Sequence, residues 1–239
     1  MKITNLLTQA DRDMFDRIDR DCIAMHVPTP PKTFIELSVQ DGAGVEVERY
    51  TDRAHSWVRN MYNVMMQYTM GINSASASGY GAGLTSLKTT DGALGNVVQP
   101  IAPINNLSLE TGYLGPASDD TYGILVGTGS GIEGLDSFAL TSKIPQGVAS
   151  GQLSHAQQTL TPSWSDVTKK FTALQSRIFN NNSGASIIVS EVAWVANYYW
   201  NSLKGKYCML CRDLLASPVT VPNAGQLTVT YTIEMTFPA

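Results

Sequence analysis

A strict alternation of apolar and polar residues over residues 226–238 constrains the fold of this chain more than any other stretch. One parity of the stretch carries only apolar side chains: Leu227, Val229, Tyr231, Ile233, Met235 and Phe237. The other parity carries threonines and a glutamate. A period of two is typical of a strand with one buried and one solvated face, and threonine suits the solvated side of a pleated sheet. The stretch therefore predicts an antiparallel sheet that covers a core.

Further strand signals precede this stretch. Residues 172–179 and 185–195 are strand-like and are separated by a polar, glycine-containing turn at 180–184, which predicts a β-hairpin. Residues 218–222 read as a short strand that a turn at 223–225 ends. The second half of the chain is therefore expected to be an antiparallel all-β unit.

The order of these elements carries a recognisable pattern of turns and strands. Its matching residues are Asn181, Asn182, Ser183, Gly184, Ile187, Val189, Glu191, Arg212, Asp213, Leu214, Pro218, Val219, Val221, Pro222, Gly225 and Tyr231. The pattern resembles the C-terminal β-domain of structural proteins of tailed bacteriophages. Residues 122–129 and 151–155 resemble the opening of the same domain. The chain departs from the pattern at 193–200, AWVANYYW, where the family has an ordinary short strand end.

The resemblance covers roughly the second half of the chain and contains no catalytic motif. It implies a virion structural protein that self-assembles, with the tail, neck or baseplate as its expected place. The expected partners are further copies of the same chain, in a symmetric homo-oligomer, and other virion proteins. The expected location is the virion, assembled in the cytoplasm of the host bacterium.

Composition agrees with an assembly protein and excludes other classes. Charged residues make up 15% of the 239 residues, below the roughly 25% of ordinary soluble domains. The net charge of −4 provides no basic surface, so no nucleic-acid partner is predicted. No apolar run approaches the roughly 20 residues of a membrane span, so no membrane partner is predicted. Three cysteines do not suggest a disulfide scaffold.

The first half of the chain predicts mixed structure. Residues 4–24 have the apolar spacing of an amphipathic helix, which Pro28, Pro30 and Pro31 end. Residues 33–40 and 45–51 flank an Asp-Gly turn and predict a hairpin. In the first of these runs Phe34 does not share the parity of Leu37 and Val39, so the register stays open.

Residues 54–70 predict a second helix. Its apolar stripe is a core face or an adaptable partner surface, and consists of Trp57, Met61, Val64, Met65 and Tyr68. Residues 74–95 are rich in glycine, serine and alanine and form either an arm over a neighbouring subunit or a loop that covers nothing.

The fold class that follows is mainly β. A C-terminal antiparallel β-sandwich follows an N-terminal α+β part with two helices and a hairpin. The expected divisions are an N-terminal helix at 1–27, the hairpin, helix and arm at 28–95, a turn-rich linker at 96–120 and the sandwich at 121–239.

Several motifs that could carry chemistry lack the residues that the chemistry needs. The glycine-rich stretch 127–134 lacks a following helix and a Walker lysine. Cys208 and Cys211 form a lone CxxC without a second pair of ligands. The three histidines show no diagnostic spacing: His26, His55 and His155. No catalytic residue, cofactor or metal site is therefore predicted, and the chain is not expected to be an enzyme.

The aromatic cluster Trp194, Tyr198, Tyr199 and Trp200 allows three interpretations: sandwich core, subunit interface or glycan contact. The candidate interface residues are Trp57, Met61, Met65, Tyr68, Trp194, Tyr198, Tyr199 and Trp200. Two alternative functions remain, a surface receptor- or glycan-binding module and a capsid decoration protein. Copy number per particle distinguishes a tail or neck protein from a capsid decoration protein.

Overall fold

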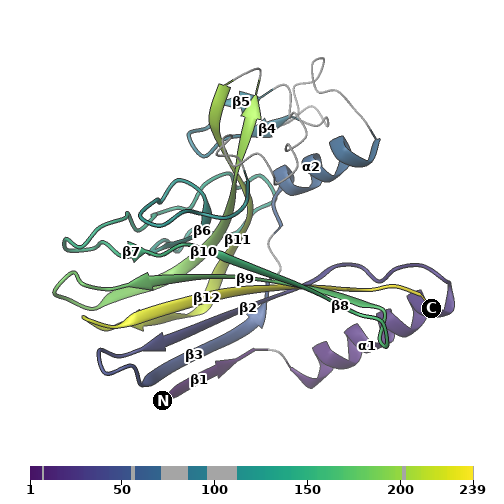
Figure 1. Ribbon diagram of the computed structural model, residues 1–239, viewed down its shortest axis with the longest axis horizontal. Helices are drawn as coiled ribbons and strands as arrows, with labels where there is room; N and C mark the ends of the chain where they lie inside the picture. The colour runs from purple at the N-terminus through teal and green to yellow at the C-terminus, as the bar shows by residue number, and fades with distance from the viewer. Residues whose placement is uncertain (7, 55–56, 71–85, 96–111, 201–202, 239) are drawn as a thin grey trace.

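The computed structural model describes residues 1–239 apart from 7, 55–56, 71–85, 96–111, 201–202 and 239. Strands make up 49% of the structure and helices 12%, so the prediction of a mainly-β fold with two helices is confirmed. Figure 1 shows two facing sheets, a long hairpin that rises away from them, and a helix beyond the end of the larger sheet. Most of the predicted linker at 96–120 lies outside the described residues.

The larger sheet has seven strands. Its main path runs through β1 (Lys2–Asn5), β3 (Glu46–Arg53), β2 (Lys32–Gln40), β12 (Gln226–Thr236), β9 (Lys170–Asn180) and β7 (Ser154–His155), and β8 (Thr159–Ser165) also pairs with β9. All pairs are antiparallel except β1 with β3. The hairpin predicted at 33–51 is therefore confirmed. Because β2 pairs along its length with β12, the 28–95 and 121–239 segments share one sheet.

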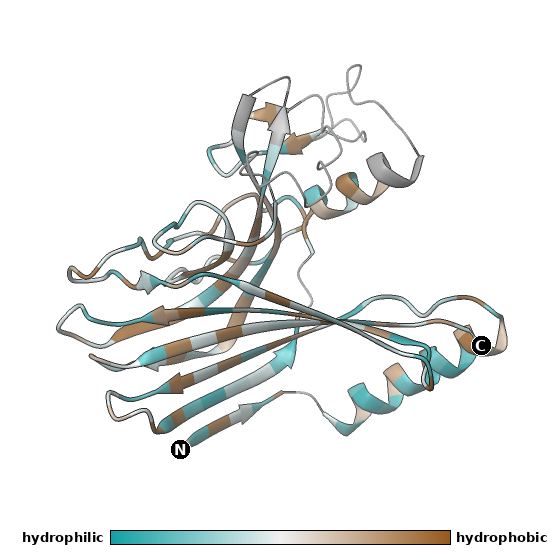
Figure 2. Ribbon diagram, in the orientation of Figure 1, coloured by the Kyte–Doolittle hydropathy of each residue, from teal (hydrophilic) through white to brown (hydrophobic). Residues whose placement is uncertain are grey.

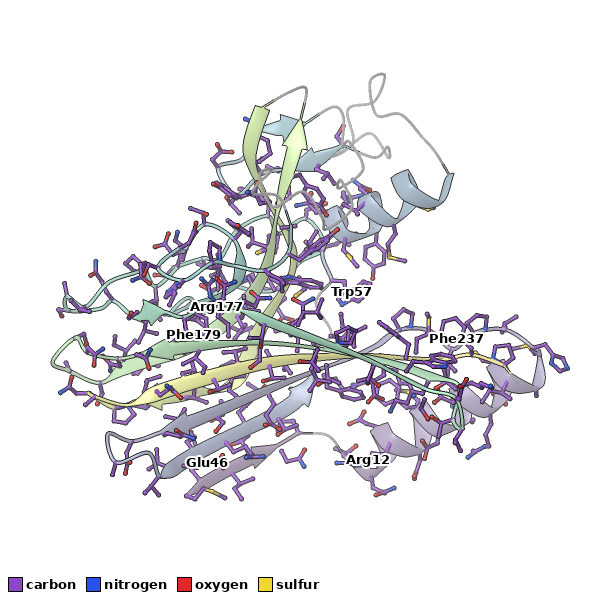
Figure 3. All side chains as sticks on the ribbon, in the orientation of Figure 1. Arg12, Glu46, Trp57, Arg177, Phe179 and Phe237 are labelled. Carbon is purple, nitrogen blue, oxygen red and sulfur yellow. The ribbon has the colours of Figure 1, made fainter. Side chains whose placement is uncertain are left out.

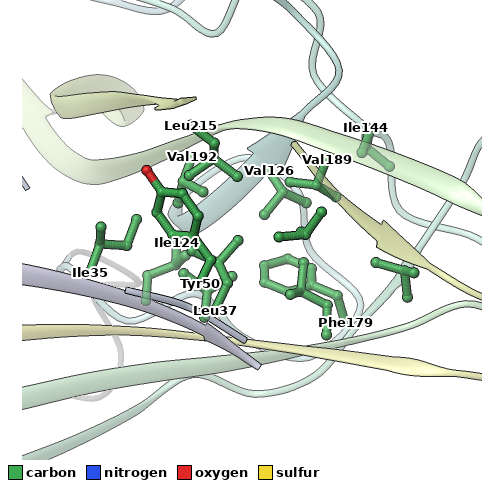
Figure 4. Packing of buried hydrophobic residues seen from close by; sticks show 14 of the residues in the cluster. Ile35, Leu37, Tyr50, Ile124, Val126, Ile144, Phe179, Val189, Val192 and Leu215 are labelled. Carbon is green, nitrogen blue, oxygen red and sulfur yellow. The ribbon is translucent and has the colours of Figure 1, made fainter. Parts of the chain in front are cut away.

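The smaller sheet has three strands. They are β11 (Leu203–Val221), β10 (Ile187–Trp200) and β6 (Gly123–Gly127). The hairpin predicted for 172–179 and 185–195 is therefore wrong, because β9 pairs with β12 in the larger sheet and β10 pairs with β11 in the smaller one. The main core lies between the two sheets, where Leu37 and Tyr50 of the larger sheet meet Val189 and Val192 of the smaller one (Figure 4). Each fully buried aliphatic side chain of this kind contributes about 1.5–3 kcal/mol relative to exposure.

The alternation that predicted the last strand is confirmed in β12. Leu227, Val229 and Tyr231 are buried, and apolar and polar residues alternate along the strand in Figure 2. The parity problem in the hairpin also has a physical reason. Phe34 lies on the outer face of β2, where its ring meets that of Phe15 in α1 (Gln9–Ala24) at 5.9 Å. The strand therefore has apolar contacts on both faces.

The helix predicted over 4–24 begins only at Gln9, and residues 2–5 form β1 instead. Thr8 ends the preceding extended chain, because its hydroxyl accepts from the Asp11 N–H at 3.1 Å and its own N–H donates to the Asp11 carboxylate at 3.0 Å. This reciprocal pair is a capping box, which fixes a helix N-terminus. A strand of four residues is too short for an alternation of apolar and polar residues to be recognised in the sequence.

The smaller sheet extends beyond the sandwich. The 193–200 stretch continues β10, and the short strand predicted at 218–222 is the end of the 19-residue β11. Shifts of register after Val189 and Trp194 mark bulges along this hairpin, and bulges bend and twist a strand pair. The extension carries α2 (Arg59–Met70) and the two-stranded unit of β4 (Leu87–Lys88) and β5 (Leu94–Gly95) (Figure 1). Residues 74–85 of the predicted arm at 74–95 lie outside the residues that the structure describes.

Candidate functional site

Two residues of the turn-and-strand pattern in the second half of the chain form a buried ion pair. Glu191 and Arg212 lie in neighbouring strands, and the carboxylate accepts from the guanidinium Nε at 2.7 Å. The carboxylate also accepts from the main-chain N–H groups of Gly129, Thr141 and Ser142. The guanidinium donates to two carbonyls of the loop that follows β6. The glycine-rich stretch 127–134 is therefore fixed to the smaller sheet by internal charges, and the N–H groups of Thr128 and Gly129 donate to the protein itself.

Arg177 is a second buried charge and comes from β9. Its side chain is fully buried, and it donates only to main-chain carbonyls, those of Pro116, Asp119, Tyr122, Ile124 and Ala156. Burial lowers the pKa of Arg177 to about 10, so the guanidinium remains charged at neutral pH. Figure 3 places it beside Phe179 inside the sandwich. Its role is to hold the segment before β6 against the larger sheet.

His155 lies beside this arginine in the core. Its ring meets the Phe179 ring edge-on at 4.9 Å, and Nδ1 donates to the Asp119 carbonyl at 3.2 Å. Within the part of the chain that the structure describes, Nε2 is buried without a hydrogen-bond partner. Burial, followed by the charge of Arg177, lowers the pKa of His155 from 6.5 to about 4. The imidazole is therefore neutral in the folded protein at neutral pH.

Acid is expected to destabilise the fold through His155. The unfolded chain protonates this group below pH 6.5 and the folded chain only near pH 4, so the unfolded state binds more protons in that window. The free energy of unfolding should fall by roughly 2–3 kcal/mol between pH 7 and pH 4.5 from this group. Urea unfolding at both pH values measures the loss, and it should shrink in His155→Gln. Parallel pH profiles for the two proteins would contradict this assignment.

The two cysteines of the CxxC are inert core residues. Cys208 and Cys211 are both buried, and burial raises the pKa of each thiol well above its ordinary value. No group of three or more His, Cys, Asp or Glu side chains in the described ranges could hold a metal ion. Neither helix in the described part of the chain is long and apolar enough to cross a bilayer.

The predicted aromatic cluster is divided by the fold. Trp194 and Tyr198 point into the protein, with Trp194 Nε1 donating to the Tyr113 carbonyl at 3.2 Å and the Tyr198 ring packing edge-on against that of Tyr113. Both therefore belong to the core, and neither offers an open ring face to a sugar. The side chains of Tyr199 and Trp200 lie outside what the structure describes, as does that of Tyr68.

The remaining candidates lie around α2. Trp57, Tyr62 and Met65 line a groove of about 410 Å³ between α2 and the end of the larger sheet. Trp57 lies in the connection that leads to α2 (Figure 3). Tyr62, Met65 and the adjacent Met66 are all exposed. Met61 instead packs against a small buried cluster of the β10–β11 extension. The α2 stripe thus divides into a core side and an exposed side.

A second exposed apolar surface, which the sequence did not reveal, lies on the ribbon formed by β8 and the start of β9. We define the ribbon patch as Leu160, Trp164, Val167 and Phe171, all of them exposed. Trp164 lies opposite Phe171 in the register, and its ring meets that of Phe237 at 5.7 Å.

The position of the patch explains why the sequence did not reveal it. Phe171 has the same parity as Arg177 and Phe179, so the core-facing side of β9 continues past the area that the core fills. The alternation of apolar and polar residues shows which face of a strand is apolar. It does not show that no second layer packs on that face before residue 172.

Comparison with known proteins adds no family. No protein-family model, curated protein or solved structure matches the chain.

Proposed function

We propose that this protein is a structural component of a tailed-bacteriophage virion that works by assembling as a symmetric homo-oligomer. The observation that carries the assembly part is the ribbon patch, because a core-facing sheet surface continues there without cover. Contiguous exposed apolar surface marks sites of protein–protein contact, and Trp is enriched among the residues that dominate such contacts. The exposed side of α2 adds a second surface of the same character.

The virion part of the proposal rests on the pattern of turns and strands in the second half of the chain. The pattern residues have structural tasks that suit an assembly protein. Asn181 donates to the Ala185 carbonyl in the turn that joins β9 to β10 and to the Val221 carbonyl at the end of β11. Glu191 and Arg212 fix the loop after β6. Buried polar groups are thus used to make a rigid subunit. A rigid subunit suits a symmetric particle, since its interfaces need no rearrangement before they meet.

We propose that the protein lies in the tail, the neck or the baseplate of the particle. Quantitative mass spectrometry of purified virions tests this, with antibody labelling in electron micrographs as a second readout. A few to about a dozen copies along the tail axis would support the proposal. Hundreds of copies would indicate a capsid decoration protein, and absence from the particle would overturn the virion assignment.

Substitution of Trp164 tests the assembly surface directly. Trp164→Ser should weaken self-association at least about 30-fold, since a hot-spot aromatic contributes about 2 kcal/mol or more. Analytical ultracentrifugation over a concentration series measures the change. Ile188→Ser is the matched control, because Ile188 is equally exposed but belongs to the smaller sheet. If the two variants associate equally, the ribbon patch is not the assembly surface. A parent protein that is monomeric would favour the glycan-binding alternative, which a sugar array would test.

A further inference from the structure

The N-terminal arm, defined as β1 and α1, is attached to the rest of the subunit by surface contacts. No side chain of α1 is buried, and three of the four residues of β1 are exposed. A 16-residue helix is only marginally stable alone in water. It therefore depends on docking against sheet residues, which any copy of the chain can provide.

Besides the pairing of β1 with the edge strand β3, the arm docks through one aromatic contact and through side chains of complementary charge. The Phe15 ring meets the Phe34 ring, and the Asp19 carboxylate lies 2.5 Å from Lys32 Nζ. Farther along the helix Asp11 lies 3.3 Å from an Arg53 guanidinium nitrogen. Acidic groups of α1 thus face basic groups of β2 and β3, and Lys2 of β1 faces Glu48 of β3 at 2.5 Å. The receiving residues belong to strands that the rest of the sheet also holds.

The connection between the arm and β2 has the features of a hinge. His26 ends α1 in a left-handed conformation with a φ of 56°, as is common at a helix C-terminus, and its N–H and that of Val27 donate to carbonyls of the last helical turn. Pro28 follows and stiffens the connection. Thr29 is then anchored, because its N–H donates to the Thr236 carbonyl and its hydroxyl accepts from the Thr236 N–H, both at 2.7 Å. The chain can change direction between residues 25 and 28 without disturbing the sheet.

Apolar side chains gather at this hinge and are left in solvent. Ile23, Met25 and Val27 are 39%, 64% and 41% exposed. In a two-fold pair whose arms cross, the two hinges run past each other, so these side chains would be buried against their counterparts. Burial of this kind would favour exchange of the arm between two copies.

From these observations we infer that the arm is exchanged between two copies of the chain, with each arm docking on β2 and β3 of its partner. The inference rests on the proposed homo-oligomer and names one of its contacts. The docking contacts are the same within a subunit and between subunits. Burial at the crossed hinges therefore favours the exchanged form.

Cross-linking between two differently tagged chains tests the exchange. Both chains carry Cys22→Ser, one carries Asp19→Cys and the other Lys32→Cys, and the two are co-expressed and treated with a short bismaleimide. Exchange predicts a covalent heterodimer, because the new thiols are adjacent only when the arm of one chain docks on the other. A partner chain with Ile188→Cys in place of Lys32→Cys is the control and should give no heterodimer.

A single chain with both Asp19→Cys and Lys32→Cys shows whether the reagent bridges these positions. It should give covalent dimers if arms are exchanged and an internally bridged monomer if they are not. Mass measurement on the same samples separates the two proposals. An oligomer with only internal bridges would overturn the exchange and leave the homo-oligomer standing, whereas a monomer at every concentration would overturn both.

Discussion

Arg177→Met should lower the free energy of unfolding by about 3–5 kcal/mol. The substitution keeps much of the side-chain volume and removes every donor. Five main-chain carbonyls that now accept from the guanidinium would be left buried and unpaired. Gly115 shows how closely the site is packed, since a Cβ there would lie 2.6 Å from Arg177 Nη1. Water therefore has little room to replace the lost donors.

Urea unfolding followed by tryptophan fluorescence measures this loss. Arg49→Met is the matched control, because Arg49 also lies in a strand of the larger sheet but its ion pairs are exposed at the surface. The control should lose no more than about 1 kcal/mol. If Arg177→Met does not fold, Arg177→Lys keeps the charge and some of the hydrogen bonds and should show an intermediate loss. A loss below about 1 kcal/mol in Arg177→Met would show that the carbonyls find other donors.

Glu191→Gln should destabilise the protein by about 3 kcal/mol or more although it changes one atom. The carboxylate uses one oxygen for the N–H groups of Gly129 and Ser142, and the other for the Thr141 N–H and Arg212. A glutamine amide can satisfy only one of these pairs, and its NH₂ group would face two donors. The Arg212 guanidinium, 3% exposed, would also lose its neutralising charge.

Glu36→Gln provides the comparison for this experiment. Glu36 lies on β2 with a side chain that is 44% exposed and a guanidinium nitrogen of Arg49 at 3.6 Å. An exposed pair of this kind contributes about 0–1 kcal/mol, so the control should unfold nearly as the parent does. Hydrogen exchange at Thr141 and Ser142 adds a local readout and should speed up in Glu191→Gln only. Equal stability of the two variants would mean that the buried pair does not hold the loop.

The sequence predicted those helices and strands that the pattern of neighbouring residues is enough to define. The alternation over 226–238 became β12, and the Asp-Gly turn placed the β2–β3 hairpin, because in both cases neighbouring residues contain the information. Pairing of β2 with β12 could not be read, since it joins residues almost two hundred positions apart in the chain. Helix α2 begins five residues later than the 54–70 stripe suggested, because Trp57 bridges to Cys211 before the helix starts.

The candidate surface was harder to predict than the fold. An apolar side chain on a strand gives the same signal whether another layer covers it or not, so Phe171 in the ribbon patch and Tyr198 in the core look alike in sequence. Arg177, by contrast, can be recognised from the sequence as a buried charge. It shares the inward parity of Ala173 and Phe179, and a charged residue at such a position indicates a buried polar network.

The position of β12 between β2 and β9 sets the order in which the protein can fold during synthesis. Its two neighbours are translated first, yet each lacks a hydrogen-bonding partner on one edge until β12 leaves the ribosome. The nascent chain therefore holds two open strand edges over an unfinished core, a state that favours aggregation. We expect a chaperone to occupy these edges, and ribosomes stalled before residue 226 to carry it.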